Sequence, residues 1–119
     1  MGLDNGLVCR NFPKAGTTNR DFEFCYWRKF WDFRDEVLDY LEFEEENYTY
    51  YLQLPQLEDI RDIMVKYTDL EYVKKHNTQT IWNDSEVVEM MRNNLIEFDE
   101  FLKFFKKNPG FKVYFYDSY

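Results

Sequence analysis

Hydrophobic residues recur along the chain with two different periods, and the period changes several times. Alternation of apolar and polar positions is typical of a strand with one buried face. Four segments show this alternation: residues 2–10, 21–26, 48–54 and 111–119. Steps of three and four residues instead place side chains on one face of a helix. Three segments show these steps: residues 27–41, 55–67 and 85–107.

The segment 85–107 has the most regular helical spacing. Its apolar positions are Val87, Met91, Leu95, Phe98, Leu102 and Phe105. The polar residues 83–86 offer side chains that cap a helix N-terminus, and the Asn-Pro-Gly run at 108–110 is typical of a helix end. A shorter helix is predicted over residues 69–76, with Asp69 as its N-cap.

These elements predict an α+β fold in one compact domain that spans residues 1–119. Three or four short strands would form a small mixed or antiparallel sheet. Three or four helices, two of them long, would pack against one face of it. We expect the closing strand to lie beside the first strand. Gly6 inside the first strand marks a close approach to the backbone or, with Asn5, a tight turn.

The densest aromatic stretch, residues 24–31, includes two cations, and the helical stripe that runs on from it contains a third, Arg34. A guanidinium on a buried face needs a carboxylate or phosphate partner. One interpretation is structural, with Arg34 paired to a core carboxylate such as Asp4. The other is a ligand site in which cations hold a phosphate and rings stack on a base. The candidate ligand residues are Asp4, Trp27, Arg28, Trp31, Arg34 and Tyr116.

Charge and composition favour binding to proteins over binding to duplex nucleic acid. The chain has 23 acidic and 15 basic residues, a net charge of -8, and 12 Phe, 10 Tyr and 3 Trp. Duplex binding depends on clustered Lys and Arg that displace counterions from phosphates, so the acidic excess argues against it. Tyrosine and tryptophan, in contrast, are enriched among the residues that dominate the energetics of protein interfaces.

Acidic side chains are concentrated in residues 32–46, next to a tyrosine-rich strand. They can form a solvated helix face, or they can oppose a basic groove on a partner protein by imitating phosphates. They lack the spacing of an EF-hand loop, so no metal site is predicted. The candidate partner-binding residues are Asp35, Asp39, Glu44, Glu45, Glu46, Tyr48 and Tyr50.

The sequence contains no standard catalytic or cofactor-binding motif. The four glycines are too scattered for a phosphate-binding loop. The single histidine, His76, lies in a polar run and is predicted to be a surface residue at a helix end. Cys9 and Cys25 have no metal-binding spacing. A disulfide between them is one option, and two buried free thiols are the simpler expectation. We therefore expect no cofactor and a binding protein rather than an enzyme.

Three short motifs resemble a family of small phage and prophage proteins. Members open with Met-Gly-Leu-Asp-Met-Tyr, carry Tyr-Trp-Arg-Lys at the head of a helix and close on an aromatic tail. The corresponding segments are residues 1–4, 26–29 and 114–119. The resemblance is collinear over the whole chain and implies a phage origin and one compact domain. Arg34 stands where members of the family often have histidine.

The resulting hypothesis is a phage-encoded accessory protein that binds and inhibits a host protein through an acidic and aromatic surface. The partner would be a nucleic-acid-binding protein or an anti-phage defence enzyme in the cytoplasm of the bacterial host. The alternative is a nucleotide-type ligand binder, or sponge, that uses Arg28, Arg34 and the neighbouring rings. The chain has no long apolar run and no secretory segment, so neither a membrane span nor export is expected.

Overall fold

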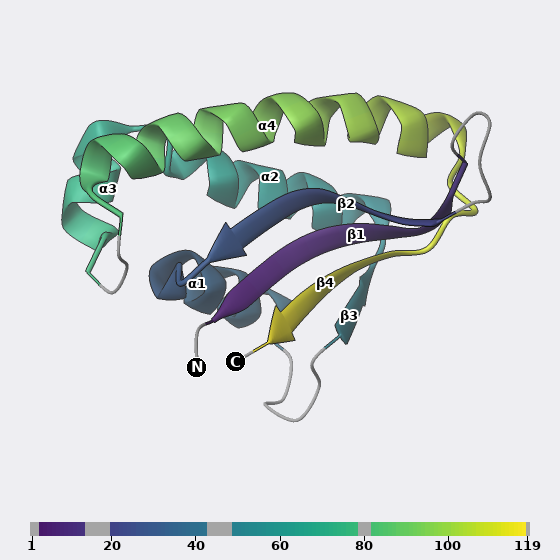
Figure 1. Cartoon of the computed structure of the whole chain (residues 1–119), viewed down its shortest axis with the longest axis horizontal. Coiled ribbons are helices and arrows are strands. Elements are labelled where there is room, and N and C mark those ends of the chain that lie inside the picture. Colours follow the sequence, from purple (N-terminus) through teal and green to yellow (C-terminus); the bar gives the residue numbers. More distant parts are fainter. Residues whose placement is uncertain (1–2, 14–19, 43–48, 79–81, 119) are drawn as a thin grey trace.

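The computed structural model describes residues 3–13, 20–42, 49–78 and 82–118, which form four strands and four helices (Figure 1). In chain order these are β1 (Asp4–Phe12), β2 (Arg20–Arg28), α1 (Trp31–Leu41), β3 (Thr49–Leu52), α2 (Leu54–Lys66), α3 (Leu70–His76), α4 (Asp84–Lys107) and β4 (Val113–Ser118). Every predicted strand and helix is present, with ends that differ by a few residues. The predicted α+β fold is therefore confirmed.

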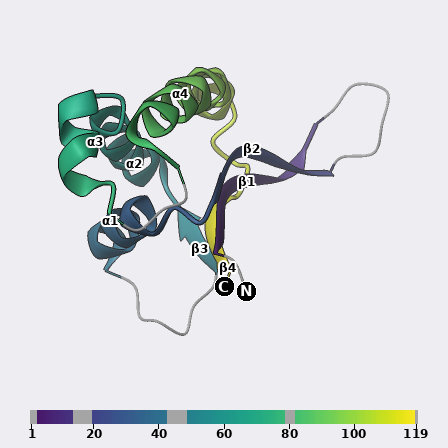
Figure 2. The same cartoon turned by 60° about the vertical axis from the view of Figure 1, so that its left-hand side comes forward.

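The four strands form one antiparallel sheet in the order β2-β1-β4-β3. In the central strand β1, Leu7 pairs with Cys25 of β2 and with Phe115 of β4. The closing strand thus lies beside the first one, as predicted. All four helices lie on one side of the sheet (Figure 2). The opposite face is therefore covered by none of the helices in the described part of the chain.

Aromatic rings fill the layer between the helices and the sheet. Phe24 of β2 stacks on Phe101 of α4 with ring centroids 4.0 Å apart. Trp27 packs against Phe33 of α1 at 4.6 Å, and Phe33 in turn meets Tyr67 edge-on. A buried ring removes a large apolar area from water, so these contacts supply much of the free energy that joins the two layers.

The largest error of the sequence prediction lies at the start of α1. The apolar spacing predicts a helix from Trp27, but Trp27 belongs to β2 and pairs with Asn5 of β1, and α1 begins at Trp31. Between the two elements, Lys29 has a left-handed φ of 53°, which interrupts both strand and helix geometry. Trp27 is buried in either arrangement, so hydrophobic spacing alone does not locate this boundary.

The buried face of α1 also differs from the predicted stripe. Its buried residues are Phe33, Val37 and Leu41, and Arg34 is half-buried at the edge of this face. The predicted stripe includes Arg34 because it counts helical turns from Trp27, four residues before the helix begins. A cation at such an edge can reach into the core and still contact solvent.

The structure confirms the long helix α4 and the expected N-terminal caps. The side chain of Asn83 accepts a hydrogen bond from the Glu86 backbone N–H at 2.9 Å, and the Asn83 N–H donates to the Glu86 carboxylate at 3.2 Å. This reciprocal capping box satisfies two backbone N–H groups that have no partner inside the helix. Asp69 caps α3 as predicted, because its carboxylate accepts from the N–H of Glu71.

Cys9 and Cys25 are buried free thiols, which confirms the simpler expectation for the two cysteines. Burial raises the pKa of both thiols, and the pKa of Cys9 rises to about 11 with a further contribution from the charge of Asp21. Reactive cysteines need an accessible thiolate, so neither thiol is suited to nucleophilic chemistry at neutral pH.

Candidate functional site

Tyrosine side chains gather on the sheet face that points away from the helices. Buried and half-buried residues alternate along β4, which places Tyr114 and Tyr116 on the face opposite the core. Tyr51 of β3 pairs with Tyr114, and Tyr26 of β2 is joined to Tyr116 through their shared partner Gly6. Tyr26 and Tyr51 are 44% and 49% exposed. We call Tyr26, Tyr51, Tyr114 and Tyr116 the tyrosine face.

Two phenols of the tyrosine face donate hydrogen bonds to carboxylates on other strands. The Tyr26 hydroxyl donates to Asp4 of β1 at 2.5 Å, and the Tyr116 hydroxyl donates to Glu23 of β2 at 2.6 Å. The hydrogen bond to Asp4 raises the pKa of Tyr26, and burial together with the hydrogen bond to Glu23 raises the pKa of Tyr116. Both phenols therefore stay protonated at neutral pH, and both rings are held in place.

Gly6 allows the ring of Tyr116 to lie across β1. A Cβ atom at Gly6 would sit 2.4 Å from Cε1 of Tyr116 and 2.9 Å from Oε2 of Glu23, both closer than van der Waals contact. The ring therefore passes over the glycine on its way from β4 to Glu23 of β2. Of the two expectations for Gly6, the close approach is confirmed, because residues 5 and 6 lie within the paired strand β1 rather than in a turn.

Replacing Gly6 with alanine is expected to displace the Tyr116 ring and break its hydrogen bond to Glu23. Forcing a methyl group into a filled space costs about 1–3 kcal/mol, which urea denaturation would measure. The control is Gly110→Ala, because a Cβ at Gly110 meets no atom within 4 Å, and its stability should stay near that of the parent or rise slightly. Equal stabilities of the two variants would contradict the close approach.

At one end of the sheet, on the helix-covered side, Arg34 of α1 binds Asp117 of β4. The guanidinium donates from Nε to both carboxylate oxygens at 3.2 Å and from Nη2 to Oδ2 at 2.8 Å. Asp117 is 2% exposed, and Asn5 of β1 also donates to it at 2.8 Å. Arg34 donates from Nη1 to Asp35 as well, and its guanidinium lies 5.7 Å from the Trp31 ring centroid.

The structural interpretation of Arg34 was therefore right about a carboxylate partner and wrong about its identity. Asp4 precedes Asn5 in β1, and consecutive strand residues point to opposite faces. Asp4 thus lies on the open side, where it accepts from Tyr26, while Asn5 reaches Asp117. The hydrogen bonds with Asp117 raise the pKa of Arg34 despite its partial burial, so the guanidinium keeps its charge and is committed to protein carboxylates.

The residues predicted for a ligand site lie at the same end of the sheet but on opposite faces. Asp4 and Arg28 are cross-strand partners on the open side, where Tyr116 also lies. Arg34 contacts Asp117 on the helix-covered side, and Trp27 on that side is 0% exposed. A ligand therefore has no access to the Trp27 ring in this structure, and the six candidate residues do not line one pocket.

The predicted partner-binding residues are placed only in part. Asp35 is exposed but accepts from Arg34, and Asp39 is exposed on α1. Tyr50 is 2% exposed and stacks on Phe115, so it is a core residue rather than a contact for a partner. Its neighbour Tyr51 is exposed instead, because consecutive strand residues point to opposite faces. Four other predicted residues lie outside the described residues: Glu44, Glu45, Glu46 and Tyr48.

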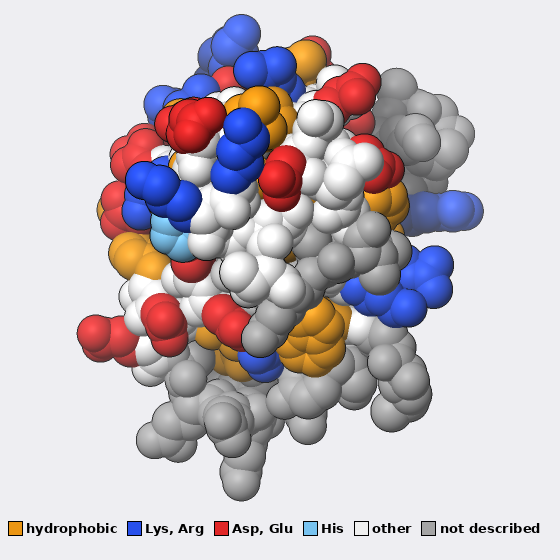
Figure 3. Space-filling model, turned by 90° about the vertical axis from the view of Figure 1, so that its left-hand side faces the viewer, with side chains coloured by type: hydrophobic (Ala, Val, Ile, Leu, Met, Phe, Trp, Pro, Cys, Tyr) orange, Lys and Arg blue, Asp and Glu red, His pale blue; other side chains and the backbone are white. Residues whose placement is uncertain are grey.

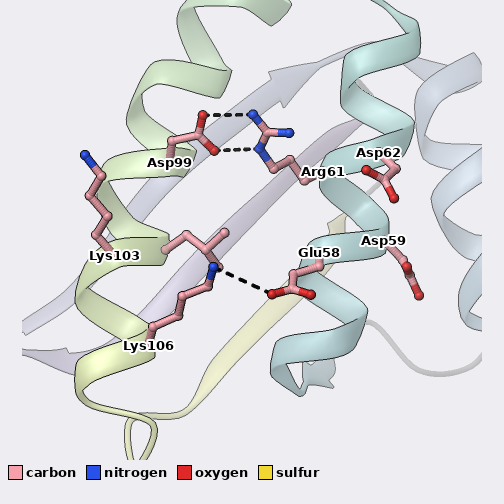
Figure 4. Close-up of a pocket in the computed structure, with 8 residues that line it drawn as sticks. Glu58, Asp59, Arg61, Asp62, Asp99, Lys103 and Lys106 are labelled. Atoms are coloured by element: carbon pink, nitrogen blue, oxygen red, sulfur yellow. Dashed lines mark hydrogen bonds and ion pairs between the residues drawn. The ribbon is translucent and has the colours of Figure 1, made fainter.

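A surface groove between α2 and α4 is lined mainly by charged side chains, and two ion pairs cross it (Figure 4). Arg61 of α2 donates to both oxygens of Asp99 of α4, at 2.6 and 3.0 Å, and lowers the pKa of that carboxyl. Lys106 of α4 lies 3.8 Å from Glu58 of α2. These two pairs link α2 to α4, and the groove lining as a whole mixes acidic and basic side chains.

The surface at the α3 end of the molecule carries interspersed acidic and basic side chains rather than a patch of one sign (Figure 3). The only histidine of the chain, His76, is exposed there among charged neighbours, as predicted. Its Nδ1 lies 2.9 Å from the backbone oxygen of Tyr72, and its ring stacks on the Tyr72 ring. These contacts are those of a helix-end residue, and among the described residues no nucleophile or carboxylate is bonded to the imidazole.

Metal ligation and membrane insertion gain no support from the described ranges. Within residues 3–13, 20–42, 49–78 and 82–118, no group of three or more His, Cys, Asp or Glu side chains could hold a metal ion. In the same part of the chain, no helix combines the length and apolar character needed to cross a bilayer.

No family model matches the chain, and neither the curated proteins nor the solved structures yield a significant match.

Proposed function

We propose that this chain is a phage-encoded binding protein that inhibits a host protein by covering part of its surface with the tyrosine face. The observation that carries the proposal is the row of tyrosines on a sheet face that no described helix covers. Tyr26 and Tyr51 are nearly half exposed, and the phenols of Tyr26, Tyr51 and Tyr116 are hydrogen-bonded to side chains on other strands. Anchored rings lose little conformational entropy on binding.

The chemistry of the face supports a protein partner. Tyrosine and arginine are enriched among residues that dominate protein interfaces, and this face combines its four tyrosines with Arg10 and Arg28. Asp4 and Glu23 lie between the rings and accept from two of the phenols. A mixture of both charge signs suits a polar protein surface better than a continuous row of phosphates.

The acidic excess supports a partner with a basic surface, such as a nucleic-acid-binding or defence enzyme of the host cytoplasm. Asp35 and Asp39 on α1 and Asp59 and Asp62 on α2 are exposed, and the whole chain carries a net charge of -8. Charges outside a contact surface steer association even when they add little to final affinity. The tyrosine face would then supply affinity, and the acidic helices would raise the association rate.

The test compares three versions of the protein as bait in host lysate. The parent and Ile96→Ala, which alters a side chain that is 62% exposed on α4, should retain the same partner. The double variant Tyr26→Ala/Tyr51→Ala should lose it. With the purified partner, calorimetry should give at least about a tenfold weaker affinity for the double variant than for the parent. The parent and the Ile96→Ala control should lower the partner's activity, and the double variant should not. Equal binding by all three versions would overturn the proposal.

A further inference from the structure

One end of the open sheet face holds two cations against the exposed ring of Tyr51. Arg10 of β1 donates from Nη1 to the Tyr51 hydroxyl at 2.8 Å. Lys112, just before β4, places its Nζ 5.9 Å from the Tyr51 ring centroid. The rings of Tyr51 and Tyr114 lie with their centroids 5.7 Å apart. We call Arg10, Lys112, Tyr51 and Tyr114 the basic end of the face.

The cations of the basic end share a hollow with the carboxylate of Asp21 but form no ion pair with any described side chain. The nearby Asp21 accepts from the backbone N–H of Asn11 at 3.2 Å. Arg10 donates one hydrogen bond to the neutral phenol of Tyr51, and a guanidinium has five N–H groups in all. In a chain with a net charge of -8, two cations beside one ring that pair with no described carboxylate form a local concentration of positive charge.

Two adjoining hollows flank these cations and share the wall formed by residues 110–112. The first is also lined by Arg10 and Asp21, and the second by Tyr51 and Phe105. Gly110 contributes no side chain to either hollow. A small ligand could therefore place an anionic group beside the cations and keep a flat group against the Tyr51 ring.

We propose that the basic end binds a nucleoside monophosphate, with the phosphate on Arg10 and Lys112 and the base stacked on Tyr51. Arginine and lysine are the usual protein partners of phosphate, and a tyrosine ring stacks on any base because every base has a π-face. This site differs from the one expected around Arg34, whose guanidinium is committed to Asp117 and Asp35. It does not depend on the proposed inhibition of a host protein.

A mononucleotide fits the surroundings better than a nucleic-acid strand does. Asp4 and Glu23 lie farther along the same face, where the phosphates of a longer strand would meet them, and the net charge of the chain repels a polyanion. A single phosphate between Arg10 and Lys112 avoids Asp4 and Glu23 and has only the Asp21 carboxylate of the same hollow to oppose it among the described residues.

The experiment is a titration of the ¹⁵N-labelled full chain followed by two-dimensional NMR. The probes are AMP, adenosine, inorganic phosphate and a short single-stranded oligoadenylate. AMP should shift the amide signals of Arg10, Tyr51 and Lys112 with a dissociation constant of about 1 mM or below, and should bind more tightly than adenosine or phosphate alone. Arg10→Gln, Lys112→Gln and Tyr51→Leu should each weaken AMP binding by about tenfold.

Lys74→Gln is the matched control, because Lys74 is an exposed cation on α3, at the opposite end of the molecule (Figure 1). It should leave AMP binding unchanged. Because Arg10→Gln also removes the hydrogen bond to Tyr51, Lys112→Gln tests the charge with that bond intact. The proposal is overturned if AMP shifts none of these signals, if phosphate binds as tightly as AMP, or if the oligoadenylate binds far more tightly. No partner protein is present, so the result is independent of the test of inhibition.

Discussion

Replacing Arg34 with methionine is expected to lower the free energy of unfolding by about 3–5 kcal/mol, because it leaves the carboxylate of Asp117 buried without its cation. The side chains of Asp117 and Arg34 are 3% and 18% exposed, so water can replace little of the lost interaction. Asn5 would still donate to Asp117, but one neutral amide does not balance a buried charge. Urea denaturation followed by circular dichroism would measure the loss.

The matched control is Arg61→Met, which removes a guanidinium–carboxylate pair of similar geometry at the surface. Arg61 and Asp99 are 36% and 43% exposed, so this change should cost about 1 kcal/mol or less. The double variant Arg34→Met/Asp117→Asn removes both buried charges and should recover part of the stability lost in Arg34→Met. A cost for Arg34→Met no larger than that for Arg61→Met would show that the buried pair does not stabilise this end of the fold.

The sequence identified Arg34 as a residue in need of a partner, but it could not identify Asp117. The two residues are 83 positions apart, and their contact depends on β4 pairing with β1 in one register. In that register Asp117 lies opposite Asn5 rather than opposite Asp4. A shift of one residue would move Asp117 to the open face. The type of interaction follows from local pattern, whereas the partner follows from pairing between distant strands.

Alternation within each strand indicates which tyrosines point away from the core, but only one strand at a time. In β4, apolar Val113 and Phe115 alternate with Tyr114 and Tyr116, and the structure confirms that the apolar pair faces the core. In β3, however, Tyr50 and Tyr51 are the same residue type, so only the neighbouring Leu52 shows which of them is buried. The four tyrosines share one surface because of the strand order and because the helices cover the other face. Local spacing along the sequence predicts neither of these.

Trp27→Ala is expected to lower the free energy of unfolding by about 3–5 kcal/mol, because it removes a fully buried ring and leaves a cavity between β2 and α1. Trp27 is 0% exposed and packs on Phe33. Trp31→Ala is the control: its half-buried ring loses less buried area, so the cost should be smaller. Urea denaturation of both variants, with the milder Trp27→Phe in case Trp27→Ala does not fold, would measure the difference.

The variant Trp27→Phe also separates a structural role for Trp27 from the ligand-stacking role that the sequence also allowed. If Trp27 stacked on the ligand, the substituted protein would lose its response to AMP but keep its stability, since the Trp27 ring would face the ligand rather than the core. If Trp27 is a core residue, substitution lowers the stability and leaves AMP binding unchanged. Trp27→Phe should therefore bind AMP as the parent does, because the basic end is formed by other strands. Trp27→Phe with parental stability and no AMP response would return the ligand site to the Arg34 end of the sheet. The expected opposite result would leave Tyr51 as the ring that meets a base.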